Sequence, residues 1–205
     1  MSVNPRERSI KNELKLQVLI LFGCVAMAWA LELFDLFVLK GGYNFRGGLD
    51  QYGIIPRDLI GLRGILFAPF LHGGLGHLIS NTIPFLVLGW LVMLRETSDF
   101  FVVSILSALV SGLGTWVFGA SGTHIGASGV IFGYLGYLLA RGYFERSMTA
   151  IAISLFVGTL YGSLIWGVLP LQPGVSWEGH LFGFLGGILS AKLLADDKRS
   201  VGGHR

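Results

Sequence analysis

The hydrophobic and polar positions of this chain are arranged in long blocks, in which apolar runs alternate with short polar turns. Six runs come close to the roughly 20 apolar residues that a helix needs to cross the hydrocarbon core of a bilayer. They cover about residues 16–39, 77–94, 100–119, 125–140, 148–168 and 179–195. The pattern therefore predicts an all-α membrane protein, a bundle of six transmembrane helices.

The connection between the first two runs, residues 40–76, is long and too apolar for an ordinary loop. Arg57, Asp58 and Arg63 interrupt its apolar clusters, so no part of it is long enough and free enough of charge to span a membrane. We predict that this first loop lies partly immersed in the membrane interface.

The same blocks divide the chain into three parts. Residues 1–15 are polar and mixed in charge, which is typical of a short cytoplasmic flank. Residues 16–195 hold the six runs and form the predicted membrane domain. Residues 196–205 are a polar C-terminal tail.

Composition supports the membrane class. The chain is 53% hydrophobic and 13% charged, with a mean hydropathy of +0.68, which excludes an ordinary soluble domain. The net charge is +3, but the basic residues are spread over short flanks and form no nucleic-acid-binding patch. The single cysteine, Cys24, allows no internal disulfide.

The distribution of the basic residues predicts an orientation. Most of the 15 Lys and Arg residues lie in the N-terminal flank, the tail and the turns at 95–99 and 141–147, which share one side of a six-span layout. Cytoplasmic loops carry an excess of such residues. We therefore expect a multi-pass protein with both termini in the cytoplasm, in the plasma membrane of a bacterium.

In this layout the second, fourth and sixth runs all begin at the outer side, and each begins with polar side chains: His77 and Asn81, then Ser128, then His180. The fourth run amounts to about 24 Å of helix, whereas the hydrocarbon core is about 30 Å thick. Its first residues should lie below the outer surface, where non-helical backbone must face protein or water. We expect a water-filled pocket there with Ser128 at its floor.

Glycines recur every three or four residues in two of the runs, so that they share one helix face. They include Gly126, Gly129 and Gly133 in the fourth run and Gly179 and Gly183 in the sixth. Bare faces let two helix backbones approach closely in a membrane. The two stripes are therefore expected to bring Ser128 and His180 within hydrogen-bonding range.

A hydroxyl and an imidazole in this setting favour amide hydrolysis, which needs a nucleophile, a base and donors for an oxyanion. Ser128 would be the nucleophile, with free backbone N–H groups beside it in the first turn of its helix. His180 would be the general base and then the general acid. Glu178 lies on a poorly matched helical face, so a Ser–His dyad is favoured over a triad.

His77 and Asn81 are four residues apart and share a helix face. With the Ser128 backbone N–H they could donate hydrogen bonds to an oxyanion. The pair could instead bridge two helices, or ligate a metal together with His180. Zinc needs three or four ligands, and no suitable cysteine or carboxylate accompanies these histidines. We therefore expect no metal and no other cofactor.

Glu32 and Asp35 lie in the last third of the first run. Acidic residues inside a membrane are candidates for function. Their position near the outer end favours a simpler interpretation, in which water or lipid headgroups reach them.

Three motifs closely resemble those of the rhomboid intramembrane serine proteases. They are residues 72–81 (HGGLGHLISN), 126–129 (GASG, the family's Gly-x-Ser-Gly) and 179–187 (GHLFGFLGG). The resemblance covers essentially residues 16–195 and implies cleavage of membrane proteins within or beside their transmembrane helices. It implies Ser128 as nucleophile, His180 as base, and His77, Asn81 and the Ser128 N–H as oxyanion stabilisers.

The resemblance also has departures. Some members carry a tyrosine four residues after the serine, stacked on the catalytic histidine; here the residue is Phe132. The Trp–Arg pair of the family's first loop is missing, and Arg63 alone stands near its place.

The resemblance also implies a cap, since the family's last external loop covers the site. Here the cap would be about residues 169–177. Pro170, Pro173 and Gly174 would make it pliant, and Trp177 would anchor it at the membrane interface.

Two other functions are compatible with an apolar helical bundle. A catalytically silent rhomboid-like protein would bind membrane clients without cutting them, and the intact Ser128 and His180 argue against it. A small transporter is expected to show internal repeats or charges at the membrane midplane. The sequence has neither, so the expected partners are transmembrane protein substrates and the lipid bilayer.

Overall fold

A computed structural model describes residues 5–40, 47–172 and 174–202. The regular elements of this part are all helices, apart from one isolated antiparallel bridge between Ile54 and His124. In chain order the helices are α1 (Pro5–Phe34), η1 (Asp35–Lys40), η2 (Gly48–Tyr52), η3 (Ile60–Arg63), α2 (Gly64–Phe67), η4 (Ala68–Phe70), α3 (Leu75–Met93), α4 (Thr97–Phe118), α5 (Ser128–Glu145), α6 (Met148–Tyr161), η5 (Gly162–Val168) and α7 (Trp177–Gly202).

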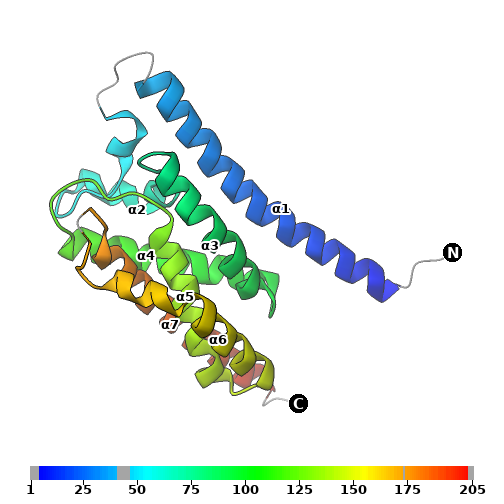
Figure 1. Cartoon of the computed structure of the whole chain (residues 1–205). Helices are drawn as coiled ribbons and strands as arrows, with labels where there is room; N and C mark the ends of the chain where they lie inside the picture. Colours follow the sequence, from blue (N-terminus) through cyan, green and yellow to red (C-terminus); the bar gives the residue numbers. More distant parts are fainter. Residues whose placement is uncertain (1–4, 41–46, 173, 203–205) are drawn as a thin grey trace.

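Helix α5 is the centre of the bundle. It packs against α7, α6, α4 and α3, while α1 lies on the outside against α3 (Figure 1). Apolar and aromatic side chains of α5, such as Tyr134, Leu135 and Leu138, are completely buried. A helix that is apolar on every side belongs in the middle of a bundle.

Helices α5 and α7 approach each other at their glycines. A Cβ atom on Gly183 would collide with the carbonyl oxygen of Gly129, and one on Gly187 would collide with the carbonyl oxygen of Gly133. No side chain can occupy these positions without separating the two backbones, so the glycines are required by the contact itself.

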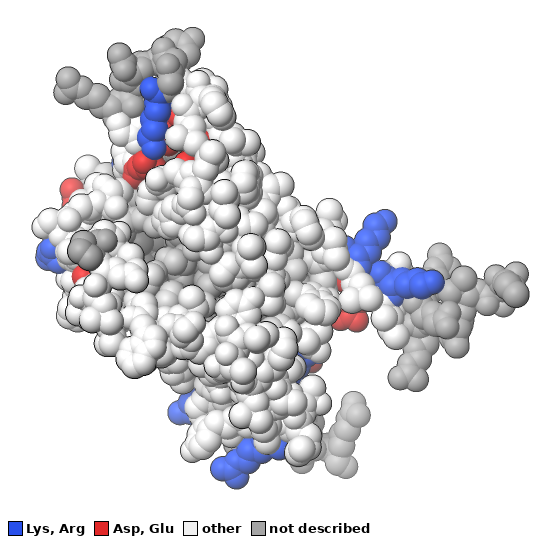
Figure 2. All heavy atoms as spheres, viewed as in Figure 1, with Lys and Arg blue, Asp and Glu red and all other residues white. Residues whose placement is uncertain are grey.

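Within the described residues, four helices are long and apolar enough to cross a membrane: Ser9–Lys40, Leu75–Met93, Thr97–Phe118 and Met148–Val168. The glycine-rich α5 and α7 are not among them, so the six-span count stays a prediction. Charged side chains gather at the ends of the molecule and leave an uncharged band between them on the face in Figure 2. This is the distribution that a bilayer demands.

The start of α5 differs from the sequence prediction. The run at 125–140 placed Gly126 on a helical stripe, but the helix begins at Ser128, and Gly126 lies in the preceding loop with φ of +116°. The Gly126 N–H donates to the carbonyl of Ala68 at 2.9 Å, which holds this loop against the first connection. Assigning Gly126 to the helix was therefore wrong, because a tertiary hydrogen bond competes with the helical turn.

The first connection supports the same loop along its length. Ile54 and His124 exchange two backbone hydrogen bonds of 2.9 Å. Arg57 makes two contacts: its guanidinium donates to the carbonyl of Gly119 at 2.9 Å, and the backbone N–H of the same residue donates to the carbonyl of Trp116 at 2.9 Å. The loop before α5 is thus anchored by main-chain contacts and not left free.

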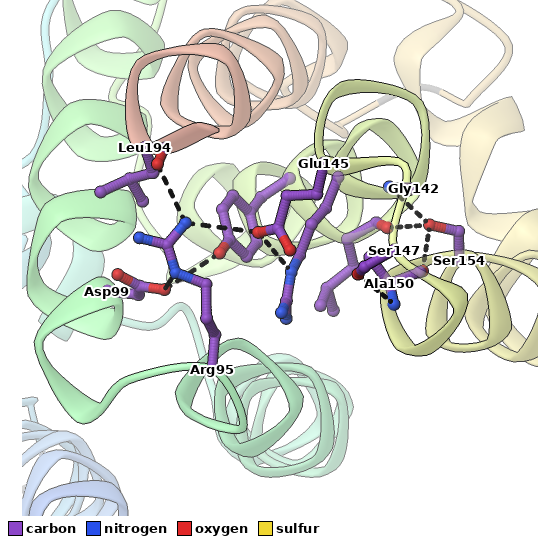
Figure 3. Close-up of polar contacts among 11 residues, drawn as sticks. Arg95, Asp99, Gly142, Glu145, Ser147, Ala150, Ser154 and Leu194 are labelled. Atoms are coloured by element: carbon purple, nitrogen blue, oxygen red, sulfur yellow. Dashed lines mark hydrogen bonds and ion pairs between the residues drawn. The ribbon is translucent and has the colours of Figure 1, made fainter. Parts of the chain in front are cut away.

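A buried charge network lies at the end of the bundle opposite the loop before α5 (Figure 3). Glu145 on α5 pairs with Arg95 at 3.3 Å and with Arg141 at 2.8 Å, and Arg95 also pairs with Asp99 on α4 at 2.9 Å. Arg95 further donates to the carbonyl of Leu194 on α7 at 3.1 Å. Charges that are removed from water must be paired, so these contacts fasten α4, α5 and α7 together.

Replacing Glu145 by alanine is expected to lower the free energy of unfolding by about 3–5 kcal/mol, because it leaves two buried guanidinium groups without their shared carboxylate. Chemical denaturation in detergent micelles measures the loss. Glu96→Ala, an exposed acid in the neighbouring turn, should change stability by less than about 0.5 kcal/mol. Equal effects of the two substitutions would contradict the interpretation.

Candidate active site

A cavity of about 980 Å³ lies at the end of the bundle opposite the charge network. Its walls come from α3, the loop before α5, the first turns of α5 and α7, and η5 with the segment that follows it. The four candidate catalytic residues predicted from the sequence all border it: His77, Asn81, Ser128 and His180. They belong to three helices that are distant in the sequence.

Ser128 is the first residue of α5. Its backbone N–H makes no hydrogen bond within the described residues, as expected at a helix N-terminus. Ser128 and His180 both line the cavity, and no hydrogen bond joins their side chains in the described structure. The site therefore combines a free hydroxyl with a free N–H group and the positive end of a helix dipole.

The protonation pattern of His77 follows from its backbone partner. The Gly73 N–H donates to Nδ1 of His77 at 3.4 Å. An N–H group can only donate, so Nδ1 is the acceptor and Nε2 carries the proton of the neutral ring. A Cβ atom on Gly126 would lie 2.6 Å from this Nε2. The proton of His77 is thus held beside the loop that leads into Ser128.

Asn81 lies one helical turn further on. Its Nδ2 would be 3.6 Å from the same Cβ position on Gly126, and it has no hydrogen-bond partner within the described residues although the residue is buried. Buried amide groups normally have partners. His77 and Asn81 therefore provide two donors on one side of the cavity, and that of Asn81 has its hydrogen-bonding capacity unused.

His180 has the opposite protonation pattern. Its Nδ1 lies 2.9 Å from the carbonyl oxygen of Gly167. A carbonyl can only accept, so Nδ1 carries the proton and Nε2 is left as an acceptor. The ring stacks on Phe132 with centroids 4.1 Å apart and planes 6° from parallel. An imidazole held in this way can take a proton at Nε2.

Contacts of glycine and serine residues set the spacing of α7 from α4 and α5 beside the site. The Ser111 hydroxyl of α4 donates to the carbonyl of Gly179 at 2.8 Å. Gly129, which follows Ser128, and Gly183, one helical turn after His180, make the close backbone contact described above. Ser128 and His180 are neighbours in sequence of these contact residues, so their relative position depends on them.

Sequence reasoning gave no role to His124, which the structure places beside the cavity. Its ring accepts from or donates to the Ser176 hydroxyl at 2.8 Å and the carbonyl of Ala120 at 2.8 Å. The Glu178 carboxylate accepts from the Ala120 N–H at 3.1 Å. These contacts tie the segment before α7 to the loop before α5. A single histidine in a loop carries no spacing pattern, so no sequence signal identified it.

Glu32 and Asp35 lie away from the cavity, and neither borders it. Both are buried, so the expectation that water or headgroups reach them was wrong. Asp35 forms an ion pair with Lys40 at 2.8 Å, and Lys40 also contacts Asp50 at 2.6 Å. Lys40, at the end of the apolar run, therefore neutralises the buried Asp35, where the sequence interpretation expected contact with water or headgroups.

Among the residues that the structure describes, no three His, Cys, Asp or Glu side chains come close enough to hold a metal ion. The predicted cap, residues 169–177, borders the cavity through Leu171, Gly174 and Trp177, while Pro173 lies outside the described residues.

Comparison with known proteins places this arrangement in a family. The family profile described as Rhomboid domain matches residues 61–197. The chain belongs to the rhomboid family. Together with its four apolar helices, membership makes it an integral membrane protein.

Relatives of this rhomboid include an uncharacterized protein of Mycobacterium tuberculosis (strain ATCC 25618 / H37Rv), 42% identical over 186 residues, which are 86% of this chain and 75% of the relative. RHOMBOID-like protein 4 of Arabidopsis thaliana is 34% identical over 154 residues, 70% of this chain and 36% of the relative. Rhomboid protease GluP of Bacillus subtilis (strain 168) is 28% identical over 194 residues, 90% of this chain and 37% of the relative.

A further histidine, His72, precedes α3 and packs against His77 of the candidate site. It is buried, and its ring centroid is 5.1 Å from that of His77. Burial, with the neighbouring His77, lowers the pKa of His72 from 6.5 to about 4. The residue therefore stays neutral in the folded protein at a pH where an unfolded chain would protonate it.

This difference predicts a pH-dependent stability. As the pH falls from about 6.5 towards 4, the unfolded chain takes up a proton at His72 that the folded chain does not, so the contribution of His72 to the free energy of unfolding is complete above this window and is lost within it. His72→Phe should reduce the slope of unfolding free energy against pH by up to about 1.4 kcal/mol per pH unit. Parallel slopes for the two proteins, measured by denaturation in micelles, would contradict the prediction.

Proposed function

We propose that this rhomboid is an intramembrane serine endopeptidase that hydrolyses peptide bonds within or next to transmembrane segments of membrane proteins, using Ser128 and His180 as a dyad. The observation that carries the proposal is that two histidines on one cavity have opposite backbone partners at Nδ1, an N–H group for His77 and a carbonyl for His180. His180 offers an acceptor nitrogen and His77 a donor, with the Ser128 hydroxyl on the same cavity. Acyl transfer needs this combination.

The reaction begins when Ser128 Oγ attacks the carbonyl carbon of the substrate and its proton passes to Nε2 of His180. The oxyanion that forms takes hydrogen bonds from Nε2–H of His77, from Nδ2 of Asn81 and from the Ser128 backbone N–H. The proton on His180 then goes to the leaving amine nitrogen as the C–N bond breaks. Water attacks the acyl-enzyme with His180 again as base, and the serine is released.

The membrane setting supports substrates that are themselves membrane proteins. We propose that α1, α3, α4, α5, α6 and α7 are the six spans, with both termini in the cytoplasm of a bacterial cell, residues 1–15 and 196–205 outside the membrane domain, and the cavity opening outward. A substrate helix must unwind locally to expose a carbonyl, so segments with weak helix propensity cost less to open. No metal or cofactor has a part in this chemistry.

The alternative is a silent relative that binds membrane clients. The observation that favours it is the lack of a hydrogen bond between Ser128 and His180 in the described structure. Catalytic hydrogen bonds are often long before substrate binds and tighten in the complex, so this observation weighs less than the assembled donors and acceptor.

Ser128→Ala and His180→Ala are each expected to abolish cleavage of a single-span model substrate by the purified protein in micelles, because each removes an atom that the reaction requires. A serine-reactive fluorophosphonate should label the wild-type protein and not Ser128→Ala. Ser98→Ala, an exposed serine at the opposite end, is the control that keeps full activity. Cleavage that survives both catalytic substitutions would exclude the dyad, and no cleavage by the wild type would support the silent relative.

Asn81→Ala is expected to reduce kcat by about 10²- to 10³-fold, the usual effect of losing one oxyanion donor, with KM changed little. Ile83→Ala, a surface position on the same helix, should cleave at the wild-type rate. A fall in kcat of less than about threefold for Asn81→Ala would remove this residue from the oxyanion site.

A further inference from the structure

The carbonyl that orients His180 belongs to a backbone segment whose local hydrogen bonding is interrupted. In η5, a 3₁₀ helix, each carbonyl is expected to accept from the N–H three residues later, and the Leu169 N–H does donate to Trp166 at 3.2 Å. For Gly167 the residue three positions on is Pro170, which has no N–H. The next N–H, that of Leu171, donates to Leu169 at 2.8 Å. The Gly167 carbonyl therefore has no local donor.

This unpaired carbonyl meets the imidazole directly. The Gly167 oxygen lies 2.9 Å from Nδ1 of His180. A Cβ atom at position 167 would lie 2.7 Å from Cζ of Phe132 and 3.4 Å from that Nδ1. Only a residue without a side chain can approach the stacked rings of Phe132 and His180 so closely. Gly167 thus lets the carbonyl approach His180, and Pro170 leaves that carbonyl without a competing N–H donor.

The charged and titratable groups near this contact are engaged elsewhere. Glu178, two residues before His180, accepts from the Ala120 N–H. His124 contacts Ser176 and Ala120. Within the residues that the structure describes, the Gly167 carbonyl is the hydrogen-bond acceptor for Nδ1 of His180. It occupies the place that a carboxylate takes in a Ser–His–Asp triad.

We propose that the Gly167 main-chain carbonyl, left without a local donor by Pro170, is the positioning group that holds His180 with its proton on Nδ1 and its acceptor nitrogen towards Ser128. The catalytic part of this inference rests on the proposed function, whereas the effect on the ring's protonation pattern does not. Gly167 and Pro170 are positioning residues, since they act through His180 and neither residue touches the reacting atoms.

The position of this carbonyl links the base to one wall of the cavity. Helix α6 is fastened to α5 midway along its length, where the Ser154 hydroxyl donates to the carbonyl of Leu138 at 2.7 Å and accepts from the Gly142 N–H at 3.1 Å (Figure 3). Nearer the cavity, none of the residues of η5 is buried, although Leu164 and Val168 pack against the core. Displacing η5 from α7 would remove the acceptor, so His180 is a correctly oriented base only while this wall is docked.

The first readout is the protonation pattern of the ring. Nitrogen NMR of protein with ¹⁵N-labelled histidine in micelles distinguishes protonated from bare ring nitrogens, and a His180→Gln spectrum assigns the signals. The wild type should show His180 protonated at Nδ1. Pro170→Ala supplies an N–H that competes for the Gly167 carbonyl, and Gly167→Ala displaces the stacked rings. Both variants are expected to populate the other tautomer at His180.

The second readout is cleavage of the model substrate. Loss of the orienting hydrogen bond should lower kcat about tenfold for Pro170→Ala and more for Gly167→Ala, with KM within about twofold. Gly162→Ala is the matched control in the same element, because a Cβ there meets no atom within 4 Å. It should keep both the wild-type tautomer and the wild-type kcat. Thermal unfolding of each variant checks that the fold is intact.

The outcomes separate the two proposals. A folded Pro170→Ala or Gly167→Ala protein in which His180 keeps the wild-type tautomer overturns the positioning role, whether or not cleavage falls. A shifted tautomer with a matching loss of kcat supports it. If the wild-type protein cleaves no substrate, the proposed function fails, while a tautomer shift in the two variants still supports the Gly167 contact.

Discussion

The backbone contact between α5 and α7 is the constraint on which the rest of this structure depends. Lipid is as apolar as the helix surfaces, so helices in a bilayer associate through close packing and hydrogen bonds rather than through exclusion of water. Here Gly129 meets Gly183 and Gly133 meets Gly187 with no room for a side chain on α7. Ser128 and His180 each lie next to, or within one turn of, these glycines. Any separation of the backbones would therefore move the candidate nucleophile away from the candidate base.

Main-chain groups set the chemistry of the two histidines on the cavity. The Gly73 N–H makes His77 a donor at Nε2, and the Gly167 carbonyl makes His180 an acceptor at Nε2. A buried carboxylate in either place would have to be desolvated or paired. Backbone groups perform the orientation without an added charge, which suits a site enclosed by apolar helices.

The two ends of the bundle differ in character. At one end Arg95, Asp99, Arg141 and Glu145 form a buried network that fastens α4, α5 and α7. At the other end lies the cavity, walled partly by η5, which is not buried. Firm anchoring at the closed end holds these three helices in place, while η5 on the cavity wall has no buried residue. This division is consistent with a site that must admit a large substrate.

Residue patterns along the chain were enough to predict the helical class, the approximate helices, the family motifs and four polar residues that border the cavity, His77, Asn81, Ser128 and His180. These features are local, since apolar runs, glycine spacing and short motifs are written in neighbouring residues. Tertiary structure decided where α5 begins, because the hydrogen bond from Gly126 to Ala68 competes with helix formation. It also decided that Lys40 neutralises Asp35, and that Pro170 leaves the Gly167 carbonyl free for His180. Each of these depends on which donor, acceptor or charge a group meets in the folded chain, and a one-dimensional pattern does not encode that partner.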